Sequence, residues 1–161
     1  MTDRETPATG VATRQAVTDL ILRIFRVNGS LLHAGDRLVA PLGLTSARWQ
    51  LLGGIAAADE PQPIAQLARA IGISRQAVQR IANELEQEGV IRFRPNPRHK
   101  RAQLVLFTPH GQALFDAAIA LQEPWAERLA GNLTAEQVET ACDALDGLAA
   151  ILEVMRNEAD G

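Results

Sequence analysis

The chain has 161 residues, which suits one domain or a small module with additional helices, and its scarce aromatics favour a helical, aliphatic core. Its formal net charge of −3 argues at first against a nucleic-acid partner. No apolar run approaches the roughly 20 residues that span a bilayer, the polar N-terminus lacks a signal-peptide core, and the lone Cys142 excludes an intrachain disulfide, so we expect a cytoplasmic protein without membrane segments.

The charge is unevenly distributed along the chain. Residues 64–107 contain seven Arg and Lys100 against three acids, which gives this segment a net charge of +5. Residues 1–63 are neutral, and residues 108–161 carry −8. A basic middle segment of this kind is a local electrostatic footprint for a polyanion, and the charge of the whole chain conceals it.

The N-terminal part of the chain predicts one long helix. Residues 1–12 are rich in Thr, Pro and small residues, and we expect them to be disordered. From Thr13 to about Ala40 apolar residues recur at helical spacing, which predicts a long helix with a bend near Gly29 or Gly35. The sequence Pro-Leu-Gly then ends this helix.

Three shorter helices follow. Thr45 is a suitable N-cap for the first of them, Pro63 opens the second, and Ser74 caps the third. Gly72 lies in the tight turn between the second and third helices, and Gly89 ends the third. Two short helices joined by such a turn form a helix-turn-helix arrangement.

After the third short helix the apolar period changes from 3.6 to 2. This change predicts two strands, over residues 91–94 and 102–107, which form a hairpin with the basic tip PNPRHKR. Thr108 is then positioned to cap a helix over residues 109–130, in which Pro124 is expected to cause a kink. A capping box of Thr134 and Gln137 predicts a last helix over residues 135–157.

The second helix of the helix-turn-helix has the composition of a DNA-reading helix. Arg forms bidentate hydrogen bonds with guanine, and Gln and Asn do so with adenine, and these types occupy the face opposite the apolar stripe. No acid occurs from Ile64 to Asn83, which an ordinary solvated face would not require. The acids Glu84, Glu86 and Glu88 lie toward the C-terminal end of this helix, away from the N-terminal residues that usually enter the groove. We expect DNA contacts from Ser74, Arg75, Gln76, Gln79, Arg80 and Asn83.

The hairpin tip provides a second basic surface. Five cationic side chains and one His occur within ten residues of this segment. A narrow minor groove attracts inserted Arg, and the neighbouring phosphates attract the other cations. We therefore expect further DNA contacts from Arg94, Arg98, Lys100 and Arg101.

These segments together resemble the MarR family of bacterial regulators, most strongly over residues 42–111. The wing NPRHKR and the following LVLFTPHG match the family patterns N-P-x-D-x-R and L-T-x-x-G. The resemblance implies a mainly α fold with a small β-hairpin wing in a single domain over residues 13–161. Its winged helix-turn-helix is expected at 45–107, between dimerisation helices at 13–41 and 109–157. It further implies that Arg101 reaches the minor groove and that Gln79 and Arg80 contact bases.

His99 departs from the family pattern. The family usually has Asp at this position, where the carboxylate pairs with the wing arginine and orients it. Because neutral His cannot supply a carboxylate, Arg101 is either freer here or positioned by another acid. The substitution motivates the hypothesis that DNA binding by the wing depends on pH.

The resemblance also implies a homodimer on a palindromic operator, with recognition helices about 34–36 Å apart. The last helix has more apolar surface than one short intramolecular contact needs, from Leu133, Val138, Leu145, Leu148, Ile151, Leu152 and Met155. Members of the family often bind a small, frequently anionic aromatic effector between the dimer helices and the reading head. The candidate residues for that site are Phe25, His33, Arg37 and Trp49. Alternatively, Trp49 packs the first helix onto the reading head, and His33 and Arg37 are surface residues or pair with Asp36 or another chain.

We predict a DNA-binding repressor rather than an enzyme. The sequence has no nucleophile motif, phosphate-binding loop or paired apolar carboxylates, and we expect neither a cofactor nor a metal site. Cys142 is expected to be a small core residue rather than a redox switch. The alternatives are a winged-helix protein-interaction module and a nonspecific architectural DNA binder. Repression by occlusion needs only tight binding, so a repressor is preferred to an activator.

Overall fold

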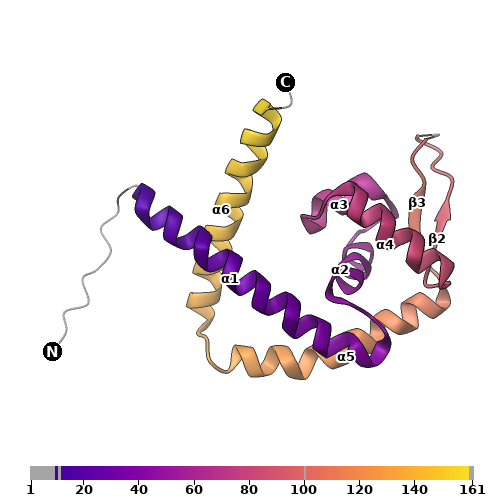
Figure 1. Ribbon diagram of the computed structural model, residues 1–161, viewed down its shortest axis with the longest axis horizontal. Coiled ribbons are helices and arrows are strands. Elements are labelled where there is room, and N and C mark those ends of the chain that lie inside the picture. The colour runs from indigo at the N-terminus through magenta and orange to yellow at the C-terminus, as the bar shows by residue number, and fades with distance from the viewer. Residues whose placement is uncertain (1–9, 11, 100, 160–161) are drawn as a thin grey trace. The chain divides into compact units, whose positions relative to one another are not determined.

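The computed structural model describes residues 10, 12–99 and 101–159. The chain divides into two compact units, one up to Ala118 and one from Ile119. The elements, labelled in Figure 1, are α1 (Arg14–Val39), a 3-10 helix (Ala40–Leu42), α2 (Ser46–Ala56), β1 (Gln62–Pro63), α3 (Ile64–Ile71), α4 (Arg75–Gln87), β2 (Ile91–Arg94), β3 (Leu104–Phe107), α5 (Pro109–Ala130) and α6 (Ala135–Ala159). The mainly helical fold with a small antiparallel sheet confirms the predicted fold class.

Side-chain caps begin the helices where the sequence predicts. Thr45 Oγ1 accepts a hydrogen bond from Arg48 N at 3.3 Å, and Ser74 Oγ accepts one from Ala77 N at 3.2 Å. Such caps satisfy backbone N–H groups that the first helical turn leaves without partners. α1 is a single helix that continues through both glycines at which we considered a bend.

The core of the first unit lies between α2, α3, α4 and the sheet. The predicted apolar stripe of α4 is buried there, and each of its four members is at most 4% exposed. α2 provides Leu51 and Leu52, which are fully buried, and the C-terminal end of α1 provides Val39. This packing holds the apolar side of α4 against the core and leaves its polar face exposed. The buried set is Val39, Leu44, Leu51, Leu52, Ile64, Leu67, Ala68, Val78, Ile81, Ala82, Leu85, Val90, Ile91, Val105 and Ala118.

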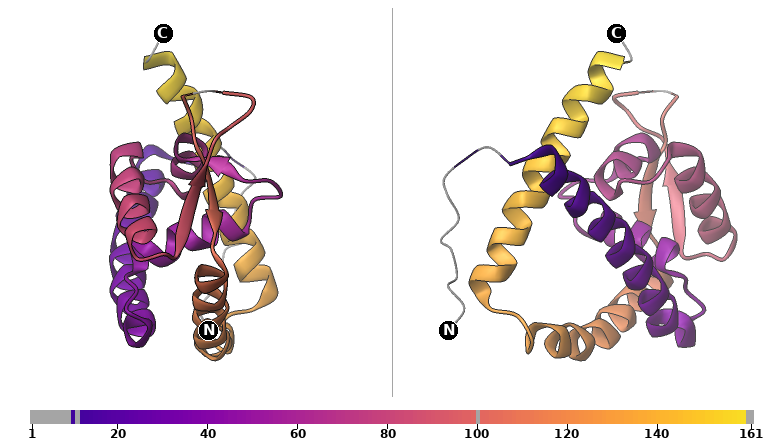
Figure 2. Two further views of the ribbon diagram at one scale, coloured as in Figure 1. Left: turned by 90° about the vertical axis from the view of Figure 1, so that its right-hand side faces the viewer. Right: turned by 60° about the vertical axis from the view of Figure 1, so that its left-hand side comes forward.

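The sheet has three strands rather than the two of the predicted hairpin. β3 pairs antiparallel with β2 over Phe93↔Val105 and its neighbours, and on its other edge with β1, in the order β1-β3-β2 (Figure 2). β3 begins at Leu104, two residues later than predicted. β1 has only two residues, one of them Pro, so it has no alternating pattern that a sequence could reveal. Its pairing ties the start of α3 to the base of the wing.

In the second unit, the predicted capping box at the start of α6 is confirmed. Gln137 N donates to Thr134 Oγ1 at 3.1 Å, and Thr134 N donates to Gln137 Oε1 at 2.9 Å. Cys142 is exposed, so the prediction that it is a core residue is wrong for the single chain. None of the α6 side chains that the structure describes is fully buried, and most of the large apolar ones are exposed, whereas Leu148 is half-buried. No helix in the described part of the chain has the length and apolar character to cross a bilayer.

Candidate nucleic-acid interface

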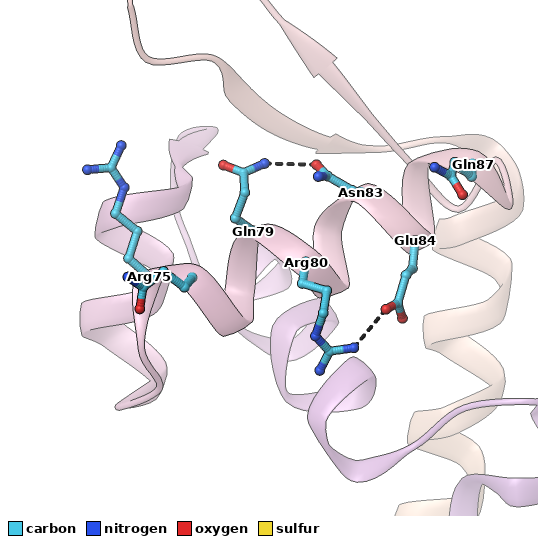
Figure 3. Close-up of a pocket in the computed structure, with 7 residues that line it drawn as sticks. Arg75, Gln79, Arg80, Asn83, Glu84 and Gln87 are labelled. Carbon is cyan, nitrogen blue, oxygen red and sulfur yellow. Dashed lines mark hydrogen bonds and ion pairs between the residues drawn. The ribbon is translucent and has the colours of Figure 1, made fainter.

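The exposed face of α4 is concave and carries most of the predicted base-reading side chains. Arg75, Gln76, Gln79, Arg80 and Asn83 line one shallow surface together with Glu84 and Gln87 (Figure 3). The buried stripe on the opposite side of the helix presents this face outward. Ser74 lies at the beginning of the helix, where its hydroxyl is used as the N-cap.

Two amides on this face are coupled to each other. Gln79 Nε2 donates to Asn83 Oδ1 at 2.8 Å, one helical turn along α4 (Figure 3). This hydrogen bond leaves the Gln79 carbonyl oxygen as a free acceptor and the Asn83 amide nitrogen as a free donor. Adenine presents a donor, N6–H₂, beside an acceptor, N7, in the major groove. The coupled pair therefore displays the groups that complement the edge of adenine.

An ion-pair network joins α2 to the reading helix. Arg48, whose side chain is only 18% exposed, lies 2.8 Å from Glu88 and 3.2 Å from Glu84. The other carboxylate oxygen of Glu84 accepts a hydrogen bond from Arg80 at 2.7 Å. Glu84 lies toward the C-terminal end of α4, as expected, but it lines the same surface as Arg80. Its carboxylate bridges the exposed guanidinium of Arg80 and the half-buried one of Arg48.

These contacts change the acidity of the groups involved. The pKa of the Glu84 carboxyl lies below its ordinary value, chiefly because Arg48 donates a hydrogen bond to the carboxylate, with a further contribution from Arg80. The pKa of Arg48 is raised, chiefly by its hydrogen bond to Glu88. Both shifts favour the charged forms and so stabilise the ion pairs of Arg48 with Glu84 and Glu88 at neutral pH. These pairs join α2 to α4 and are called the clamp below.

The clamp is expected to lose its stabilising effect in acid. A carboxyl whose pKa is depressed in the folded state stabilises the protein above the unfolded-state pKa, and the contribution disappears as the pH falls through the folded-state value. The difference in urea midpoint between the wild type and Arg48→Met should therefore shrink between neutral pH and a pH below 4.5. An equal difference at both pH values would show that Arg48 stabilises the protein only by packing.

The wing presents exposed basic side chains, as predicted. Arg94, Arg98 and Arg101 are all exposed, and Lys100 lies outside the described residues. Arg98 Nη1 lies 3.5 Å from Glu60, which precedes β1, so an acid from another segment pairs with the wing. Because β1 is attached to this sheet, the pair ties the wing tip back to the sheet's edge.

The reading helix and the wing share one groove. Arg75 and Gln79 of α4 line it from one side, and His99 and Arg101 of the wing from the other. Phe93 of β2 also lines this groove. Side chains that we predict to contact bases and side chains that we predict to contact phosphates or the minor groove therefore line one groove.

The predicted effector residues are not gathered in one place within the chain. Trp49 is half-buried and packs over Gly35 of α1, as in the alternative interpretation. Phe25 is 68% exposed and lies ten residues before Gly35 on the same helix, which places it roughly 15 Å from the residue that Trp49 covers. His33 and Arg37 are both exposed, one turn apart on α1.

Asp36, the acid considered as a partner for Arg37, makes a different contact. Its Oδ1 accepts a hydrogen bond from Ser46 N at 2.6 Å, so it fastens the start of α2 to α1. The Ser46 hydroxyl donates to Leu32 O at 2.6 Å and completes this junction.

Across the described segments, no three or more His, Cys, Asp or Glu side chains are arranged to hold a metal ion.

The helix-turn-helix exposes the polar face of its second helix, and the hairpin wing that follows lines the same groove as that face. This arrangement defines a winged-helix DNA-binding fold. The MarR family model matches residues 42–102. The uncharacterized protein Rv2011c of Mycobacterium tuberculosis is 32% identical over 144 residues, covering 87% of this chain and 96% of that protein. The chain belongs to the MarR family of transcriptional regulators.

The chain is also similar to a transcriptional activatory protein and to a regulator whose structure contains operator DNA. The transcriptional activatory protein BadR of Rhodopseudomonas palustris is 25% identical over 153 residues, covering 93% of this chain and 86% of BadR. The crystal structure of a mutant E. coli MarR complexed with operator DNA is similar to this chain with a TM-score of 0.66. It is 27% identical and covers 81% of this chain and 96% of that one.

Proposed function

We propose that this protein binds a palindromic DNA operator sequence-specifically, as a homodimer, and represses a promoter in the cytoplasm without catalysing a reaction. The observation that carries the proposal is the groove shared by α4 and the wing, which combines Gln79 with two arginines, Arg75 and Arg101. The operator complex of the E. coli relative supports DNA as the ligand. We assign DNA contacts to the ten residues expected from the sequence, Ser74, Arg75, Gln76, Gln79, Arg80, Asn83, Arg94, Arg98, Lys100 and Arg101.

The wing contribution gives a direct test of DNA binding. Arg101→Ala should weaken binding to duplex DNA roughly tenfold and reduce the magnitude of the log–log salt slope by about 1, since one phosphate or minor-groove contact is lost. Fluorescence anisotropy with a labelled duplex at several salt concentrations measures both. Arg14→Ala, at the exposed start of α1, removes the same charge and should leave both values unchanged.

The same titration separates the rival functions. Specific DNA binding requires that an unlabelled duplex of unrelated sequence competes poorly. Equal competition by every duplex would instead favour a nonspecific architectural binder, and salt-insensitive, negligible DNA binding would favour a protein-interaction module.

The homodimer is proposed from exposed apolar side chains at two places in the chain. α1 exposes Leu22 (58%) and Phe25, and α6 exposes Ile151 (60%), Leu152 (56%) and Met155 (58%). Large apolar side chains that gather on an exposed helix surface mark an interaction surface. A second copy of the chain would also double the number of reading heads, which a palindromic operator requires.

Repression is the preferred direction of regulation because occluding a promoter needs no contact beyond the DNA. Activation is the second candidate, favoured by the description of BadR as an activatory protein. A reporter gene under the bound promoter distinguishes them. A rise in reporter expression when the gene for this protein is deleted indicates repression, and a fall indicates activation.

A small anionic aromatic effector remains our proposal for releasing the DNA, with Phe25, His33, Arg37 and Trp49 as candidate contacts. The two exposed basic side chains, His33 and Arg37, lie one turn apart and are placed to bind a carboxylate jointly. In a thermal-shift screen of aromatic carboxylates, the compounds that bind should raise the Tm of the wild type more than that of Arg37→Ala. If Arg37→Ala responds identically to every hit, the site lies elsewhere.

The pH-sensitive wing also remains a hypothesis. His99 lines the groove beside Arg101 and Arg75, so its protonation would add a third positive charge to this surface. DNA affinity should then rise as the pH falls from about 8 to about 5.5. The same pH profile in His99→Gln as in the wild type would refute the hypothesis.

A further inference from the structure

The network of Arg48, Glu84 and Arg80 places an acid among the base-reading side chains. Arg80 is 69% exposed on the concave face, and its guanidinium is held 2.7 Å from Glu84 of the same helix. A guanidinium that reads guanine must present two donors to the base at once. Because the guanidinium is planar and rigid, the contact of its Nη1 atom with Glu84 restricts the orientations in which Arg80 can present two donors to a base edge.

Releasing the contact with Glu84 has an electrostatic cost if Glu84 has no other partner. A carboxylate left unpaired near DNA phosphates is repelled by them and also attracts Arg80 back. Arg48 removes this difficulty, because its Nη2 atom lies 3.2 Å from the Glu84 oxygen that Arg80 does not contact. Glu84 is thus already paired from the protein side before Arg80 moves.

The position of Arg48 suits this task. Its side chain is 18% exposed and is fixed by two hydrogen bonds to Glu88, at 3.0 and 2.8 Å. A guanidinium held by a bidentate carboxylate has a defined orientation, which a flexible surface cation lacks. Arg48 is located on α2, outside the concave reading surface of α4.

We propose that Arg48 is a positioning residue for sequence recognition: it holds Glu84 so that Arg80 is free to read one base pair of each half-site. The inference rests on the proposed function. It assigns base specificity in part to a residue that is not among the side chains lining the reading surface. The base pair is one that contains guanine, since an arginine side chain reads it.

The test compares base preferences rather than affinity alone. Selection from random duplex DNA is carried out with the wild type and with Arg80→Ala. The position at which Arg80→Ala loses the base preference of the wild type is the base pair that Arg80 reads. Arg48→Met should reduce the preference at that same base pair by about tenfold, the typical discrimination of one bidentate contact, and leave the other positions unchanged. Glu86→Gln, which removes a carboxylate from α4 as Glu84→Gln does but at a residue that contacts Phe93 N rather than Arg48, should retain every preference.

Rescue separates positioning from a purely structural role. In the double variant Arg48→Met with Glu84→Gln, no carboxylate remains to retain Arg80, so the preference should return to within about twofold of the wild type. If Arg48 only clamped α2 to α4, the second substitution would restore nothing, and Arg48→Met would weaken all sequences equally. Glu84→Gln alone also lacks the retaining carboxylate, so it should keep the preference at the Arg80 base pair within about twofold of the wild type. If Arg48→Met fails to fold, Arg48→Lys takes its place, because lysine keeps the charge but lacks the fork that contacts two carboxylates, and the same loss at the Arg80 base pair is expected.

Each outcome has a separate meaning. If the wild type enriches no sequence, the proposed function fails and this inference fails with it. If the wild type enriches an operator but Arg48→Met keeps the full preference at the Arg80 position, only the inference is overturned. The same holds if Arg80→Ala flattens no position.

Discussion

Leu152→Asp is expected to convert the protein to a monomer and to weaken binding to a two-half-site operator by at least about 100-fold. Leu152 is 56% exposed in the single chain, so the substitution damages no core of the protomer. A buried carboxylate would, however, disrupt an apolar contact between α6 and a second copy. The loss in affinity is large because a monomer no longer binds its second half-site at high effective concentration. Sedimentation and anisotropy measure the two effects.

Asn157→Asp is the matched control for this prediction. It introduces the same charge into the same helix at an exposed position that is already polar. We expect an unchanged dimer and unchanged affinity for the operator. If Leu152→Asp stays dimeric and binds normally, the dimer is not formed by the apolar side chains of α6.

Gly111→Ala is expected to have the largest effect on stability. A Cβ at this position would lie 1.8 Å from Val90 O, a backbone atom that cannot turn aside. The neighbouring Thr108 fixes the same junction, since its hydroxyl accepts from Gly111 N at 3.0 Å and lies 2.6 Å from Gly89 O, to which it donates. The overpacking should cost about 3 kcal/mol and lower Tm by roughly 6–12 °C.

Gly53→Ala provides the comparison in another helix. A Cβ there meets nothing within 4 Å, so the substitution adds helix propensity without a clash. We expect a stability equal to or slightly above that of the wild type, by up to about 1 kcal/mol. Thermal unfolding of the two variants side by side measures the difference. A Tm for Gly111→Ala near that of the wild type would contradict the tight packing of α5 against the β2 entry.

The sequence predicts the local elements well because their signals are local. Thr45 and Ser74 cap helices within three residues of themselves, and a capping hydrogen bond needs no other part of the fold. The apolar stripe of α4 likewise reflects only the helical period, and Val78 and Leu85 are buried as that period implies. The polar face opposite the stripe follows from the same pattern.

The contacts that the sequence did not predict are those between distant segments. Arg48 and Glu84 are 36 residues apart, and no pattern in either helix indicates that they meet. The pair between Arg98 and Glu60 spans 38 residues. In contrast, the spacing of Arg80 and Glu84 by four residues is a signal that the sequence does offer, since such neighbours lie on one helix face. This spacing alone predicts that Glu84 shares a helix face with Arg80.

Short or context-dependent features were also missed. β1 forms only because β3 offers an edge beside the start of α3, and Pro63 lowers its strand propensity. Cys142 resembles a core residue by composition, but α6 has no partner surface within its unit that buries it. Both cases depend on what another segment supplies, and neither is encoded in the residues themselves.

Recognition of a palindrome by a homodimer is best tested by selecting bound sequences from random duplex DNA and scoring them for two-fold symmetry. We expect an enriched palindrome whose half-sites lie about one helical turn, roughly 10 base pairs, apart. Within each half-site, the positions facing α4 should show strong preferences. Sequence-specific binding by this protein would be contradicted if no sequence is enriched, or if binding is uniform across sequences and merely weakens with salt.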